Sequence, residues 1–139
     1  MKFTLSWLKD HLDTSASVDE IADGIYRISV PVPPSVAPGG FSYNQFLIRD
    51  DEPLLFHLGM RSIFGLVRDA IAAVMPPEKL RYLAFSHFEA DECGALNDFL
   101  QLAPDSVPVC SAIATMTSVG DFAARAPRTL ADGEALVLG

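Results

Sequence analysis

Cysteine is scarce in this sequence. The 139 residues include two cysteines, Cys93 and Cys110, and they do not form a C-x-x-C pair. This pattern favours reduced thiols over a disulfide framework. We therefore expect the protein to be cytoplasmic.

Positive charge and long apolar runs are also scarce. Lys and Arg total 10 against 18 Asp and Glu, so the formal net charge is −8. Nucleic acids and anionic membranes bind clustered Lys and Arg, so neither is an expected partner. No apolar run approaches the roughly 20 residues that span a bilayer. Lys9, Asp10 and Asp13 interrupt the start of the chain, which excludes a signal peptide there.

Apolar residues, in contrast, make up 50% of the chain, and its length fits one domain. Residues 1–23 carry a loose helical stripe and a Ser-x-x-Glu capping pattern, so a helical N-terminal extension is expected. Residues 24–139 alternate strand and helix patterns. They predict one body of the α+β class, α/β-like, with helices packed on a sheet.

Hydrophobic periodicity predicts the elements of that body. Residues 25–32 alternate like a half-buried strand, and 41–48 and 53–59 flank the charged turn 49–52 as a hairpin. Residues 80–85 form an apolar run without alternation, which is typical of a strand buried on both faces. The other expected elements are helices at 62–75, 93–102 and 111–123, a strand at 107–110, and two strands around an Asp-Gly turn in 128–139.

Donor side chains are concentrated directly after the strand at 80–85, in the segment SHFEADEC. In α/β sheets, functional loops follow the carboxyl ends of strands. His87, Glu89 and Asp91 are spaced two residues apart, so they can project to one side of an extended loop. One imidazole with several carboxylates suits iron or manganese, and zinc less strongly. These three residues are therefore candidate metal ligands.

Other roles for the same residues remain open. Asp91 or Glu92 can cap the following helix, because carboxylates stabilise a helix N-terminus. His87 can be a hydrogen-bonded turn residue. Cys93 lies beside the cluster, where a metal would lower its pKa. A Cys93–His87 nucleophile pair is a weaker alternative, because the sequence shows no orienting Asn or oxyanion loop.

Three segments, GIYRI, FLIRDDEPLLFHLG and LAFSHFEADECGAL, resemble in order and spacing the N-terminal half of the metallo-β-lactamase superfamily. The superfamily motif is His-x-His-x-Asp-His, and a Glu at its second His, here Glu89, resembles the flavodiiron and oxygen-binding diiron proteins. The resemblance covers about residues 24–139. It implies half of an αββα sandwich, a mixed sheet with helices on one face. It also implies that His87 and Glu89 bind one iron and that Asp91 binds a second.

Two positions depart from the superfamily pattern. The last motif position, a His in most relatives, is Glu92. The resemblance leaves it as a direct ligand, a ligand through water, or a hydrogen-bonding support for other ligands. His57 stands where relatives often carry an Asp, and it is either such a support or a buried imidazole bonded to backbone. Cys93 is a further candidate for a supporting contact.

The superfamily completes its site with a later His, a bridging Asp and a final His. The one further histidine here, His11, lies in the opening segment. The resemblance therefore implies a truncated diiron-type module, oxygen-binding or redox, that is not catalytic alone. A zinc-dependent hydrolase, in which the metal activates water, and a non-catalytic fragment remain alternatives. The sequence leaves open whether the chain is an enzyme, and the parent family would make it either an oxidoreductase or a hydrolase.

The opening segment, MKFTLSWLKDHLDTSASVDEIAD, resembles the start of the bacterial phenylalanyl-tRNA synthetase β chain over residues 1–23. The resemblance is not expected to continue beyond them. No synthetase function is implied, because the catalytic and tRNA-binding parts are absent. A fusion, an artificial sequence or a mis-joined reading frame is implied, with an amphipathic extension of chance similarity as the alternative.

A half sandwich leaves one sheet face without a covering layer. The helices at 62–75 and 93–102 are expected to bury the other face. The uncovered face is expected to expose side chains drawn from Phe41, Tyr43, Phe46, Ile48, Leu54, Phe56 and Leu58. Such a patch marks an interaction surface or an aggregation liability. We expect a homo-oligomer, a partner chain, or the N-terminal helix folded across it, and otherwise a larger aggregate or marginal stability.

Overall fold

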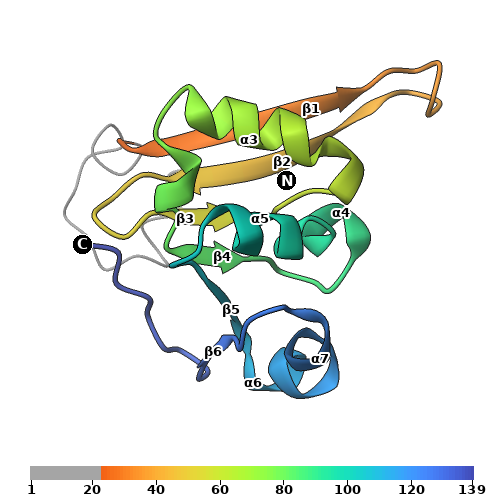
Figure 1. Ribbon diagram of the computed structural model, residues 1–139. Helices are drawn as coiled ribbons and strands as arrows, with labels where there is room; N and C mark the ends of the chain where they lie inside the picture. The colour runs from red at the N-terminus through yellow and green to blue at the C-terminus, as the bar shows by residue number, and fades with distance from the viewer. Residues whose placement is uncertain (1–22) are drawn as a thin grey trace.

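Six strands form one sheet in chain order within residues 23–139, which are the residues that the computed structural model describes (Figure 1). The strands are β1 (Ile25–Val32), β2 (Phe41–Ile48), β3 (Leu54–Phe56), β4 (Tyr82–Ala84), β5 (Val107–Ser111) and β6 (Arg128–Leu130). β1, β2 and β3 pair antiparallel, whereas β3 to β6 pair in parallel. The predicted mixed sheet is therefore confirmed. The expected N-terminal helix, up to residue 22, and His11 lie outside the described residues.

Helical segments connect the parallel strands. They are η1 (Arg61–Ile63), α3 (Phe64–Ala72), η2 (Pro77–Lys79), α4 (Ala90–Cys93), α5 (Leu96–Leu102), α6 (Ala112–Ala114), the π-helical η3 (Thr115–Val119) and α7 (Gly120–Phe122). Figure 1 shows α3, α4 and α5 on one side of the sheet, as predicted. Within the described part of the chain, no helix is long and apolar enough to cross a membrane.

The main core lies between the sheet and these helices. Leu47, Leu55 and Leu83 occupy one row across β2, β3 and β4, and all three are fully buried. Ile71 of α3 and Phe99 of α5 belong to the same core. Two-residue alternation in the strands and the helical period of α5 thus bury the side chains that the sequence pattern predicts.

The opposite face of the sheet carries a second, smaller cluster around Leu54, Tyr82 and Val109. Leu136 and Leu138 of the C-terminal segment pack against it. Leu54, one of the side chains from which the exposed set was expected to be drawn, is therefore buried, because that segment helps to cover it. The second strand expected in 128–139 does not form, since only β6 pairs with the sheet there.

Leu58, another member of that expected set, is also buried, and it belongs to the helix-side core. The reason is the backbone of His57, whose φ is +61°. A left-handed residue interrupts the alternation of a strand, so a side chain beyond it no longer follows the two-residue rule. Phe46, Ile48 and Phe56 remain half-buried on or beside the second cluster.

Candidate functional site

The loops that follow β3 and β4 meet at the carboxyl-end edge of the parallel strands. His57 follows β3, and its backbone N–H donates to Ala84 O at 2.8 Å. Residues 86–92, which we call the motif loop, follow β4. The Leu58 N–H donates to Glu92 O at 2.6 Å, so backbone bonds join the two loops. This edge is where open α/β sheets place their functional loops.

His57 is the one non-glycine residue with positive φ in residues 23–139. That conformation costs about 1–2 kcal/mol for an L-residue. Its ring stacks on Phe56, with centroids 4.5 Å apart and planes 24° apart. Its Nε2 lies 3.0 Å from Ser86 Oγ. The imidazole is thus bonded to a side chain of the motif loop, not buried against backbone.

Glu92 is the centre of the polar contacts in the motif loop. Ser86 Oγ donates to its carboxylate, at 2.8 Å from Oε2 and 3.1 Å from Oε1. The His87 backbone N–H donates to Oε2 at 2.6 Å. The two imidazoles flank it, with His57 Nε2 3.5 Å from Oε2 and His87 Nδ1 3.6 Å from Oε1. The two positions that depart from the superfamily pattern, His57 and Glu92, therefore lie against each other.

Counting hydrogens assigns the tautomer of His57. The Ser86 hydroxyl has one hydrogen and donates it to Glu92, so its oxygen accepts from His57 Nε2. His57 Nε2 therefore carries a proton in this arrangement. A protonated nitrogen has no lone pair for a metal, so His57 supports the loop and does not offer Nε2 as a ligand.

The pKa of Glu92 is lowered in the folded protein. Partial burial by itself raises this pKa, but the His87 N–H and the Ser86 hydroxyl outweigh it by hydrogen bonding to the charged form. The imidazoles of His57 and His87 lower it further. Glu92 is therefore an anion at neutral pH.

The three predicted ligands lie near one another in the chain but face different surroundings. Glu89 precedes α4 and lines a hollow of about 540 Å³ together with Phe88 and Phe122. Asp91 lines a separate hollow of about 450 Å³ beside His57. The His87 side chain is 72% exposed.

No group of three or more His, Cys, Asp or Glu side chains in residues 23–139 is arranged to hold a metal ion. The donor types present fit iron, which accepts imidazole and carboxylate ligands. The arrangement does not fit it, since Glu89 and Asp91 line different hollows and the Glu92 oxygens accept hydrogen bonds. The geometry therefore defines no metal-dependent step, and the assignment of His87, Glu89 and Asp91 as ligands stays a prediction.

Cys93 lies under the motif loop and is 3% exposed. Its Sγ donates to Glu89 O at 3.2 Å. Burial, followed by the charges of Glu92 and Asp91, raises its pKa to about 11. A thiol held in this protonated form argues against the Cys93–His87 nucleophile pair.

Ser86 is a contact of the site to which the sequence pattern assigns no role. It links His57 after β3 with Glu92 at the start of α4. The signal in the sequence is its position, because it is the first hydroxyl after the apolar run at 80–85. A polar residue at the carboxyl end of a buried strand is placed to contact the neighbouring loop.

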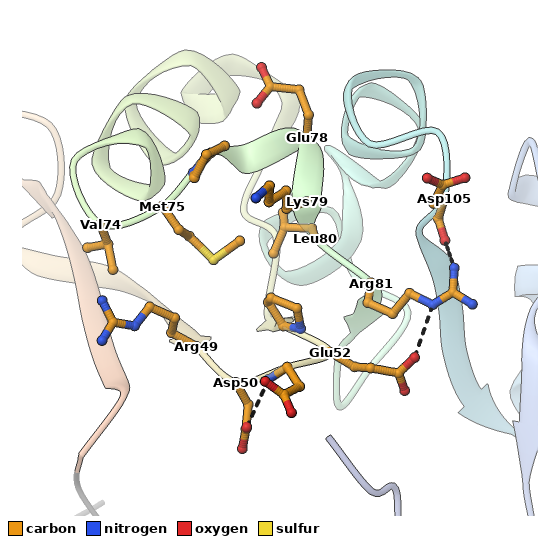
Figure 2. A pocket seen from close by; sticks show the side chains of 13 residues that line it. Arg49, Asp50, Glu52, Val74, Met75, Glu78, Lys79, Leu80, Arg81 and Asp105 are labelled. Atoms are coloured by element: carbon orange, nitrogen blue, oxygen red, sulfur yellow. Dashed lines mark hydrogen bonds and ion pairs between the residues drawn. The ribbon is translucent and has the colours of Figure 1, made fainter. Parts of the chain in front are cut away.

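A larger hollow, about 740 Å³, lies at the opposite edge of the sheet, before β3, β4 and β5 (Figure 2). Charged side chains of both signs line it. Arg81 Nη1 donates to Asp105 O at 2.7 Å, and Arg81 Nε lies 3.5 Å from Glu52 Oε1. None of the predicted site residues lines this hollow, and it is not the candidate site.

The described residues have the fold of the N-terminal part of a metallo-β-lactamase domain of the flavodiiron type. The structure of rubredoxin:oxygen oxidoreductase from Desulfovibrio gigas matches 84% of this chain and 31% of that chain, with a TM-score of 0.74 and 25% identity. A diflavin flavoprotein, A 3, of Nostoc sp. strain PCC 7120 is 35% identical over 75 residues, which are 54% of this chain. The resemblance to flavodiiron proteins in sequence and fold is thus confirmed.

The match covers only a small part of these relatives. The matched part of this chain spans 13% of the Nostoc protein. The word flavin in that protein's name therefore refers to that protein as a whole. The phenylalanine–tRNA ligase β subunit of Ruegeria pomeroyi is 69% identical over 32 residues, which are 23% of this chain and 4% of that protein. The second expected resemblance is therefore confirmed, but the expectation that it does not continue beyond residue 23 is wrong, because the match is 32 residues long. No protein-family model matches the chain.

Proposed function

We propose that the motif loop binds a metal ion of the iron type, as part of a diiron oxygen-binding or redox domain. The observation that carries the proposal is the His-x-Glu-x-Asp sequence at the carboxyl end of β4, within a sheet that matches a rubredoxin:oxygen oxidoreductase. Functional loops of such sheets lie at this edge. Iron bound there would supply redox chemistry and oxygen binding.

In this proposal His87 and Glu89 hold one iron and Asp91 contributes to a second. The side chains of all three are exposed, so they can reorient without unpacking the core. Three donors do not enclose two metal ions, whose sites each need about four or more ligands. The function proposed for the described residues is therefore a partial metal site that is not catalytic alone.

The zinc-dependent hydrolase is the second candidate. The cluster offers more carboxylates than imidazoles, and oxygen-rich donor sets favour iron or manganese over zinc. Metal identity therefore separates the two functions.

Metal analysis of the purified chain tests the proposal. After anaerobic incubation with equimolar Fe(II), Mn(II), Zn(II) and Cu(II) and removal of unbound ions, we expect iron or manganese to be retained, with copper excluded. His87→Ala and Glu89→Ala should lose the retained metal. The matched control is Glu78→Ala, an exposed carboxylate at the opposite edge of the sheet. Unchanged metal content in His87→Ala, or stoichiometric copper, would reject the assignment, and stoichiometric zinc would favour the hydrolase.

A further inference from the structure

Two hydrogen-bond donors of the motif loop point at one carboxylate, and a third donor, from the loop after β3, supports one of them. The Ser86 hydroxyl and the His87 backbone N–H donate to Glu92, and His57 Nε2 donates to Ser86 from the other side. The Glu92 side chain is 16% exposed and that of His57 is 22% exposed. This set of donors, which we call the cradle, consists of the His57 imidazole, the Ser86 hydroxyl and the His87 N–H.

We infer that Glu92 is the internal anion of this cradle and that it holds the motif loop in place without a metal ion. Glu92 is thus a positioning residue and not a metal ligand. The inference does not rest on the proposed function, because each contact in it is between groups of this chain.

The chemistry of the cradle selects an anion. The Ser86 hydroxyl and the His87 N–H present their hydrogens to the carboxylate, and His57 Nε2 presents its hydrogen to Ser86 Oγ. Such a set binds negative charge and repels a cation. The direction of each hydrogen bond is fixed by the donors, since a backbone N–H cannot accept and the one hydroxyl hydrogen goes to Glu92.

The same residue also joins three segments. Glu92 lies in α4, its side chain reaches back to the end of β4, and its backbone oxygen accepts from Leu58 N–H after β3. The left-handed backbone of His57 keeps the imidazole in place at the cost of strain. Such strain persists only where the surrounding contacts hold the residue in place.

Chemical rescue tests the inference. Glu92→Ala empties the cradle while leaving its donors, and we expect the melting temperature to fall by roughly 5–10 °C. Formate at about 200 mM should restore about 2–4 °C of that loss, because a small carboxylate can occupy the space. Sodium chloride at the same ionic strength should restore less than about 1 °C, because an ion that binds the folded protein more weakly stabilises it less. All samples contain EDTA, so metal binding cannot contribute.

Glu89→Ala is the matched control. It removes a carboxylate from the same motif loop. The Glu89 side chain makes no capping hydrogen bond to α4, so this substitution removes no such bond. Its melting temperature should stay near that of the unsubstituted protein and should not respond to formate beyond chloride. Equal effects of formate and chloride on Glu92→Ala, or an unchanged melting temperature in that variant, would overturn the inference.

Native-state hydrogen exchange tests the inference in the unsubstituted protein, without any variant. The His87 amide lies in an exposed loop, yet it should be protected at least about 100-fold in EDTA, because its hydrogen is bonded to Glu92. Exchange of this amide at the rate of a free loop in the unsubstituted protein would show that the cradle does not form without metal. Metal content is not read in this experiment, so its outcome is separate from that of the proposed function.

Discussion

The thiol of Cys93 gives a prediction at the scale of a single residue. With a pKa of about 11, its thiolate fraction at pH 8 is far below that of a free cysteine, whose pKa is about 8.5. Iodoacetamide should therefore alkylate Cys93 more than about 100-fold more slowly in the folded protein than in urea. The rate should rise with pH, because the reactive thiolate forms only as pH approaches the raised pKa. Peptide mass spectrometry in a Cys110→Ser background measures it. Native alkylation at the rate of the unfolded chain would contradict the assigned burial.

For the three predicted ligands, residue spacing alone does not predict the direction of each side chain. Side chains at i, i+2 and i+4 share one side only while the backbone stays extended. Glu89 is extended, with φ −127° and ψ 150°, but α4 begins at the next residue. Asp91 therefore lies on a helix and follows a different period from His87 and Glu89. The sequence locates the cluster at the end of β4, but the start of α4 decides where each carboxylate points.

At the scale of elements, α5 should be the strongest support of the helical layer. Phe99 is fully buried and makes an edge contact with Phe64 of α3, with centroids 4.9 Å apart. Phe99→Ala should lower the free energy of unfolding by about 3–5 kcal/mol, because it leaves a cavity between two helices and the sheet. The matched control is Phe122→Ala, whose side chain is 40% exposed and should cost less than about half as much. Urea unfolding followed by circular dichroism measures both, and equal losses would contradict the assigned core.

The elements that sequence reasoning predicts well are those whose pattern is local. The strand at 25–32 and the strand at 41–48 match β1 and β2 because alternation marks a strand with two different faces. The C-terminal segment carries the same kind of pattern, yet Leu136 and Leu138 pack on the second cluster without joining the sheet. Alternation reports which residues are apolar on one side. It does not report whether a neighbouring strand is available for pairing.

At the scale of the whole molecule, the face opposite the helices remains the least covered part of the sheet. One row crosses it from end to end: Arg27, Phe46, Phe56, Ala84, Val109 and Arg128. Ile25 on the adjoining row is 44% exposed, and Phe46 and Phe56 are half-buried. Every large apolar side chain left in water forgoes part of the roughly 1.5–3 kcal/mol that full burial provides.

A second copy of the chain is the occupant that we propose for this face, because two identical twisted sheets can pack face to face about a two-fold axis. Sedimentation velocity between about 1 and 100 µM should show a dimer or larger species. Ile25→Lys with Phe46→Lys should give a folded monomer, since two charges on the face oppose its burial. Leu66→Lys, which replaces an apolar residue 61% exposed on α3, should associate as the unsubstituted chain does. A monomer at every concentration would reject association through this face, and association that survives the double substitution but is lost in Leu66→Lys would move the interface to the helical layer.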